Sequence, residues 1–106
     1  MGYYTHFGLT IIEGDTNNGL IAKLRDENDN AAYCFDEEGN AEEGVKWYEH
    51  QTDLRAFSQK HPKALFKLTG EGEESGDVWI EYYRDGKMQE CVGKISYDEF
   101  DESKLN

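Results

Sequence analysis

The sequence has little cysteine, little proline and no long apolar run. Its 106 residues include two cysteines and one proline. Cys34 and Cys91 belong to no Cys-x-x-Cys pair and no histidine cluster at metal spacing, so we expect reduced thiols, and a disulfide between them stays open as the alternative. The apolar runs are too short to cross a membrane, and the N-terminus lacks the basic and apolar regions of a secretion signal. The sequence therefore predicts a soluble, cytoplasmic protein.

Positive charge is also scarce. The chain has 23 acidic and 11 basic residues, which gives a formal net charge of -12. Such a surface repels phosphate backbones, so direct binding to nucleic acid is not expected. Aromatic residues make up 13% of the chain, which argues for a folded domain rather than a disordered acidic segment. We expect one acidic domain over residues 1–106, with residues 97–106 as a partly ordered acidic tail.

The clearest structural pattern lies between residues 64 and 92. An apolar run ends at Thr69, an acidic loop with several glycines follows over Gly70–Asp77, and an aromatic strand begins at Val78. Asp85 and Gly86 then form a short turn, because an Asp-Gly pair accepts the positive φ angles that a tight hairpin needs. The pattern predicts a meander of three strands.

The rest of the chain alternates strand and helix patterns. A strand is expected over residues 3–13, a helix over about 17–27 after a turn at 14–16, a short strand over 31–35, a loop over 36–44 and extended structure over 45–50. A second helix is expected from residue 52 or 53 to 61, ended by Pro62. This order predicts a ferredoxin-like α+β fold, β-α-β-β-α-β with one or two further strands, in which two helices cover one face of an antiparallel sheet. The predicted core is Phe7, Leu9, Ile11, Leu20, Leu24, Leu54, Phe57, Phe66, Leu68, Val78 and Ile80.

The candidate binding surface follows from alternation along the aromatic strand. If Val78, Ile80 and Tyr82 face the helices, the intervening side chains lie on the open face of the sheet. Together with the preceding loop they make an acidic and aromatic surface, and the predicted partner-binding residues are Glu71, Glu73, Glu74, Asp77, Trp79, Glu81, Tyr83 and Asp85. The alternative is that the aromatic members pack under the tail or a neighbouring strand. The acidic segment 36–43 is the next candidate.

Catalytic and metal-binding patterns are incomplete. The carboxylates of residues 71–77 do not follow a calcium-loop spacing, and residues 26–37 resemble an EF-hand loop except that Ala31 stands where the turn needs glycine. His6, His50 and His61 fall on three different elements without a neighbouring nucleophile. We therefore expect no catalytic residue, no cofactor and no metal.

Two stretches resemble a known family. His61–Trp79, with its Gly-Glu-Gly-Glu-Glu-x-Gly-Asp-x-Trp run and its continuation through residues 82–87, resembles small YubB-like proteins of ferredoxin fold encoded by phages and mobile elements. Trp47–His50 resembles the upstream part of that pattern. The resemblance covers about the second half of the chain and implies a fold and a mobile-element origin. It implies no reaction and no catalytic residues.

Two functions fit these features. The first is a phage-encoded acidic protein that inhibits a host nucleic-acid-handling defence protein, such as a CRISPR effector, by occupying its basic groove. Anti-CRISPR and DNA-mimic inhibitors are similar in size and acidity, and carboxylates facing a groove lined by lysine and arginine compete with phosphates. The alternative is a non-enzymatic interaction module that forms homodimers through the open sheet face or an edge strand.

Overall fold

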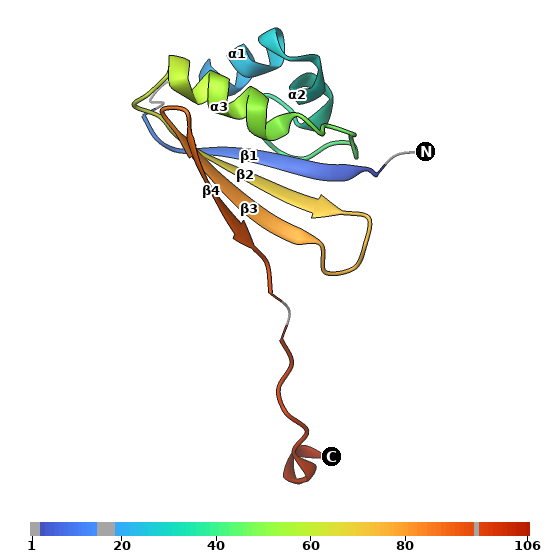
Figure 1. Ribbon diagram of the computed structural model, residues 1–106. Helices are drawn as coiled ribbons and strands as arrows, with labels where there is room; N and C mark the ends of the chain where they lie inside the picture. Colours follow the sequence, from blue (N-terminus) through green and yellow to red (C-terminus); the bar gives the residue numbers. More distant parts are fainter. Residues whose placement is uncertain (1–2, 15–18, 95) are drawn as a thin grey trace.

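The computed structural model describes residues 3–14, 19–94 and 96–106. One strand comes first, three helices follow, and three more strands close the domain before a short terminal turn (Figure 1). The elements are β1 (Thr5–Glu13), α1 (Gly19–Glu27), α2 (Asp29–Cys34), α3 (His50–Lys60), β2 (Leu65–Gly72), β3 (Val78–Arg84), β4 (Lys87–Val92) and the 3-10 turn η1 (Glu102–Lys104).

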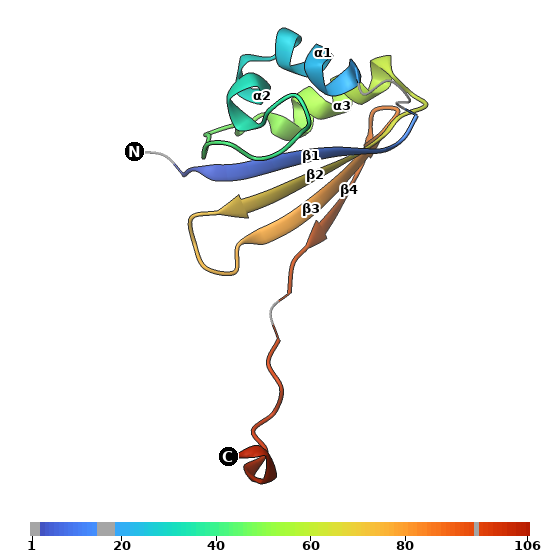
Figure 2. The ribbon, with the colours of Figure 1, turned by 180° about the vertical axis from the view of Figure 1, so that it is seen from behind.

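The sheet is antiparallel throughout, with its four strands in the order β1-β2-β3-β4. The helices lie together on one face, and the opposite face carries no helix of the described chain (Figures 1 and 2). The α+β class and the three-stranded meander are therefore confirmed. The β3–β4 turn also has the expected form, because Asp85 and Gly86 have φ angles of 49° and 77°.

The order of the elements differs from the ferredoxin-like prediction. The strand expected over residues 31–35 is wrong, because this segment forms helix α2, which the Asn28 side chain caps by accepting a hydrogen bond from the Ala31 amide at 3.1 Å. Residues 45–50 form no strand either, since Val45 makes one isolated bridge to Thr5 and His50 already begins α3. The β-α-β-β-α-β order is thus not found in the described residues. The turn and cap expected at 14–16, and the start of the first helix at 17, involve residues 15–18, outside those described.

Helix α3 confirms the predicted stop and corrects the predicted start. It ends at Lys60, just before Pro62, but it begins at His50 and its N-cap, Glu49, makes no capping bond with its side chain. Asp53, the expected cap, has another role: its Oδ2 accepts hydrogen bonds from Trp47 Nε1 at 2.8 Å and Asn28 Nδ2 at 2.9 Å. Asp53 therefore anchors the fully buried Trp47 and links α3 to the α1–α2 junction.

The core lies between the sheet and the helices. Seven of the predicted members are buried there, and Ile11 and Leu20 pack partly buried against them; the seven are Phe7, Leu9, Leu24, Leu54, Phe57, Phe66 and Leu68. The prediction for β3 is wrong, since Val78 is 38% exposed and Ile80 is only partly buried, whereas Glu81 and Tyr83 are 1% and 0% exposed. The strand presents the opposite set of side chains to the helices.

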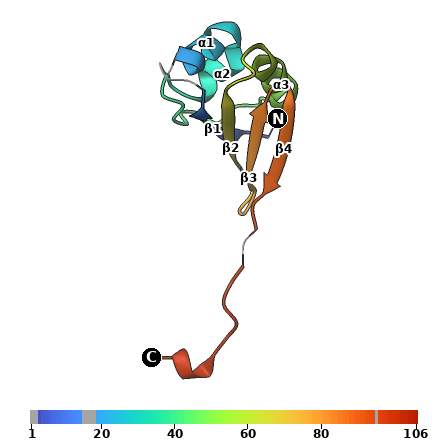
Figure 3. The same ribbon diagram turned by 90° about the vertical axis from the view of Figure 1, so that its left-hand side faces the viewer.

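The chain leaves the sheet after β4. Gly93 still pairs with β3, its amide donating to the Val78 carbonyl at 2.8 Å, and the residues from 96 onward lie away from the domain (Figures 1 and 3). Residues 96–106, which we call the tail, are exposed throughout and end in the turn η1. Asp101 caps that turn by accepting from the Ser103 amide at 3.0 Å. No helix in the described part of the chain is long and apolar enough to span a membrane.

Candidate functional site

The predicted binding residues do not form one surface. Glu71, Glu73 and Glu74 are exposed around the β2–β3 loop, and Asp77 is partly buried at its end. Trp79, Glu81 and Tyr83 lie on the helix side of β3, and Asp85 is in the β3–β4 turn. Asp85 lies eight positions after Asp77, which is about 26 Å along a strand. The structure therefore divides the prediction into an acidic loop, a buried cluster and a distant turn.

Residues at the start of the chain fix the acidic loop. The Tyr3 hydroxyl donates to Asp77 Oδ2 at 2.5 Å and accepts from the Glu74 amide at 3.1 Å, while the Tyr4 amide donates to Glu73 Oε2 at 2.6 Å. The hydrogen bond to Asp77 raises the pKa of the Tyr3 hydroxyl. Sequence patterns gave no sign of these links, which join residues about seventy positions apart.

The residues just before α3 lie at the same end of the domain as the acidic loop. The Tyr3 amide donates to the Tyr48 hydroxyl at 3.0 Å, and Lys46 Nζ lies 4.9 Å from the centre of the Tyr4 ring. This brings the exposed carboxylates near Tyr48 and those of the loop to one end of the domain. We call this group the acidic end, and it consists of Glu42, Glu43, Glu49, Glu71, Glu73, Glu74 and Asp77.

The acidic segment 36–43 is ordered by its first carboxylate. Asp36 Oδ1 accepts from the backbone amides of Glu38 at 2.9 Å and Asn40 at 3.0 Å, and these backbone bonds, that of Asn40 first, lower the pKa of Asp36. The Leu9 amide donates to the Gly39 carbonyl at 2.8 Å and so attaches the segment to β1. The segment therefore covers part of the β1 edge and leads into the acidic end.

The buried cluster on β3 has a charged centre. Glu81 Oε1 accepts from the Tyr83 hydroxyl at 2.6 Å, Oε2 accepts from Gln51 Nε2 at 2.7 Å, and His50 Nδ1 lies 3.0 Å from Oε1. Burial by itself raises the pKa of the Glu81 carboxyl, but these three neighbours together outweigh burial, so the pKa lies below its ordinary value. Burial first, and then the carboxylate, raise the pKa of the Tyr83 hydroxyl. Glu81 is thus a carboxylate held charged inside the core.

Aromatic rings enclose this cluster. The His50 ring stacks on Trp79 with their centres 5.1 Å apart and an interplanar angle of 13°, and the Phe7 ring lies 5.3 Å from His50. A cavity of about 250 Å³ lies beside them, bordered also by Tyr48 and Glu90. Both carboxylate oxygens of Glu81 already have partners from the chain, so this carboxylate is committed to contacts within the core.

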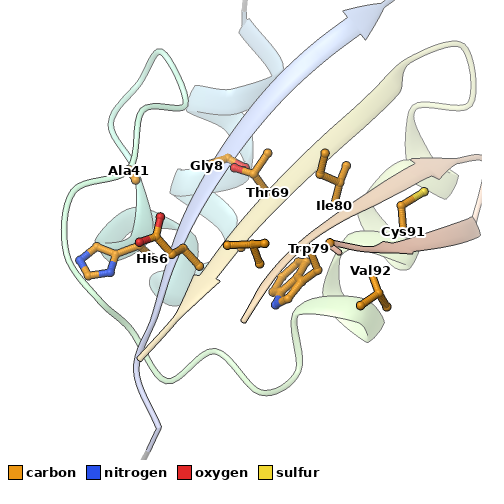
Figure 4. Close-up of a pocket in the computed structure, with 12 residues that line it drawn as sticks. His6, Gly8, Ala41, Thr69, Trp79, Ile80, Cys91 and Val92 are labelled. Atoms are coloured by element: carbon orange, nitrogen blue, oxygen red, sulfur yellow. The ribbon is translucent and has the colours of Figure 1, made fainter. Parts of the chain in front are cut away.

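The other face of the sheet carries a groove. The strand register aligns Gly8, Thr69, Ile80 and Cys91 in one row across the strands, and Figure 4 shows these four residues along it. These residues border a groove of about 450 Å³. A second groove, of about 400 Å³, lies nearer the β3–β4 turn beside Tyr82. Small side chains in the row leave the space open.

The cysteines and possible metal ligands complete the description. Both thiols are free: Cys34 is buried in the core and Cys91 is partly exposed. Burial raises the pKa of the Cys34 thiol to about 12. Among the described residues, no group of three or more histidine, cysteine or acidic side chains could hold a metal ion.

A scan against protein-family models and searches of curated proteins and of solved structures found no match to this chain. The resemblance to YubB-like proteins therefore stays a prediction.

Proposed function

We propose that the protein is a non-enzymatic acidic binding protein whose acidic end occupies a basic groove of a nucleic-acid-handling protein. In its specific form, the proposal is a phage-encoded inhibitor of a host defence protein in the cytoplasm, of the anti-CRISPR or DNA-mimic type. The observation that supports it is the gathering of seven carboxylates from two separate segments, residues 42–49 and 71–77, at one end of the domain.

Charge at this end can steer the protein to a positive surface. Glu71, Glu73 and Glu74 are exposed on one loop, and the whole chain carries a net charge of -12. Long-range attraction of this kind accelerates association and weakens as salt screens it. A basic groove that normally holds phosphates has the complementary potential.

The acidic end also has exposed aromatic rings and internal order. Tyr4 and Tyr48 are 46% and 66% exposed, and tyrosine side chains often provide the central contacts of interfaces. In the proposed binding surface, these two tyrosines provide the exposed rings instead of Trp79 and Tyr83, whose side chains pack in the core. The bonds from Tyr3 and Tyr4 to the loop hold the carboxylates in place before binding, which reduces the entropy lost on association.

A capture experiment tests this proposal. The full chain is immobilised, exposed to nuclease-treated lysate of a candidate bacterial host, and the retained proteins are identified by mass spectrometry. The proposal predicts retention of a nucleic-acid-binding protein that a double-stranded oligonucleotide displaces. The variant Glu73→Lys/Glu74→Lys should no longer retain this nucleic-acid-binding protein.

The matched control is Asp26→Lys/Glu27→Lys, which makes the same change of charge at exposed positions on α1, outside both the acidic end and the segment 36–43. Retention of the same protein by all three chains, or retention that the oligonucleotide does not affect, contradicts the proposal.

A further inference from the structure

We propose that the tail of one copy lies across the open face of a second copy, so that the protein self-associates by exchanging tails. The open face here means the side chains of the sheet opposite the helices, including Gly8, Leu65, Lys67, Thr69, Ile80, Tyr82, Arg84, Lys87, Gln89 and Cys91. This surface meets the acidic end only at Glu71, which borders the first groove, and the inference does not depend on the proposed function.

The tail displays apolar side chains that its own copy leaves in solvent. Tyr97 is 89% exposed, Phe100 is 78% exposed and Leu105 is 64% exposed. The ribbon shows the tail running away from the sheet instead of folding back on it (Figures 1 and 3). Three large apolar residues lie within nine positions, and moving such side chains out of water is favourable, so the tail has a driving force to bind an apolar surface.

The open face offers complementary space. Ile80, Tyr82 and Leu65 are only partly buried there, and no described segment covers them. The two grooves lie at opposite ends of this face, one beside Ile80 and the other beside Arg84, four residues further along β3. Each is large enough for an aromatic ring.

The tail can present one aromatic ring at a time to a groove. Tyr97 and Phe100 are three positions apart, and in an extended chain residues three positions apart point to opposite sides. When Phe100 points toward the open face it can therefore enter a groove, while Tyr97 lies on the outer side of the tail.

Charge makes this face a less repulsive one for the acidic tail of a second copy. Three basic side chains, Lys67, Arg84 and Lys87, lie on the face against three acidic ones, Glu13, Glu71 and Asp85, so it is locally neutral in a chain of net charge -12. The tail has four carboxylates within residues 98–102 and one lysine at 104. It therefore meets less repulsion on this face than on the strongly acidic surfaces of the protein.

The direction of the chain favours exchange over docking on the same copy. Gly93 continues the β4 pairing, so the chain leaves the sheet along the strand direction and points outward. To cover its own open face the tail would have to reverse immediately after β4. A second copy related by a twofold axis receives the tail without reversal, and each copy then both gives and accepts one.

Disulfide trapping tests the proposal, because Cys91 lies on the open face and Cys34 is buried. One chain carries Asp98→Cys and Cys91→Ser, which keeps the Phe100 ring, and the other is the native chain with an affinity tag that changes its mass. The two are mixed and mildly oxidised. We expect a disulfide-linked heterodimer in which peptide mapping joins position 98 of the first chain to Cys91 of the second.

The matched control carries Glu37→Cys and Cys91→Ser, which puts an exposed thiol outside the tail. Equal cross-linking of this control, or no cross-linking of the tail variant, overturns the proposal. So does an Asp98→Cys chain with Cys91 intact that forms only an internal disulfide, since the tail then docks on its own copy.

Sedimentation measures the same association without cross-linking. The native chain should form dimers as its concentration rises, and Phe100→Ala should raise the dissociation constant by at least about tenfold, as expected for an interface anchor. Lys67→Glu/Lys87→Glu should weaken dimerisation as well. Glu73→Lys/Glu74→Lys, which alters the acidic end, should leave it unchanged. A native chain that stays monomeric at all concentrations contradicts the proposal.

Discussion

Tyr83 donates a hydrogen bond of 2.6 Å to Glu81, two residues earlier on the same strand, and both side chains are buried on the helix side of the sheet. This pair determines which face of β3 the core receives. It places Trp79 on the same side, where its ring lies over Gly70 of the neighbouring strand, so that a Cβ at Gly70 would meet the indole at 2.1 Å. Trp79 is therefore a packing residue of the core.

The Glu81 cluster should contribute strongly to stability. Glu81→Ala leaves the Tyr83 hydroxyl and the Gln51 amide without their acceptor inside the core, and each unsatisfied donor costs about 1–3 kcal/mol, so we expect a loss of about 2–6 kcal/mol in the free energy of unfolding. Urea denaturation measures this loss. Glu90→Ala, at the exposed position paired with Glu81 on β4, should cost about 0.5 kcal/mol or less. Equal stability of the two variants would show that the cluster is not a stabilising unit.

Stability should also depend on pH through Glu81. Its pKa in the folded protein lies below the ordinary value of 4.5, so the unfolded chain binds the proton more readily. The resulting stabilisation is present above pH 4.5 and is lost as the pH falls through the lower folded pKa. Unfolding free energies measured between pH 7 and pH 3 should fall more steeply for the native chain than for Glu81→Gln. Parallel curves would contradict the assigned shift, because all other carboxylates are shared by the two proteins.

The two cysteines should react at very different rates. Cys34 is fully buried and its pKa is raised to about 12, whereas Cys91 is partly exposed on the open face. An aromatic disulfide reagent should label one thiol quickly in the native protein, and peptide mapping should identify it as Cys91. The second thiol should react after unfolding in urea. Rapid labelling of Cys34 in the native protein would show that the core around α2 opens.

Local signals predicted the parts of the fold that depend on a few neighbouring residues. The Asp85-Gly86 turn follows from the φ angles that this pair tolerates, and the end of α3 follows from Pro62. Helix α2 was missed because its six residues are too few for a helical pattern, and its cap depends on Asn28.

The face of β3 could not be read from alternation. Apolar residues occur on both sides of this strand, with Val78 and Ile80 on one side and Trp79 and Tyr83 on the other. From such a pattern alone, the face without a charged side chain, which is the face of Val78 and Ile80, is expected to be the buried one. The observed face buries Glu81 because Gln51, thirty residues earlier in the chain, supplies a donor, which no local pattern indicates.

Only part of the acidic end was predicted, because local patterns do not indicate contacts between segments that are far apart in the sequence. The carboxylates of residues 71–77 are adjacent in sequence and were recognised as one group. Their meeting with Glu42, Glu43 and Glu49 depends on contacts of Tyr3 and Tyr4 across the fold.

The binding role of the acidic end is tested most directly by association kinetics. The host protein retained in the capture experiment is immobilised, and surface plasmon resonance compares the native chain with two variants at two ionic strengths. Glu73→Lys/Glu74→Lys should associate more slowly and with a flatter salt dependence, because it removes the charge that steers the encounter. Tyr48→Ala should act mainly by faster dissociation. If both variants bind like the native chain at both ionic strengths, the acidic end is not the binding surface.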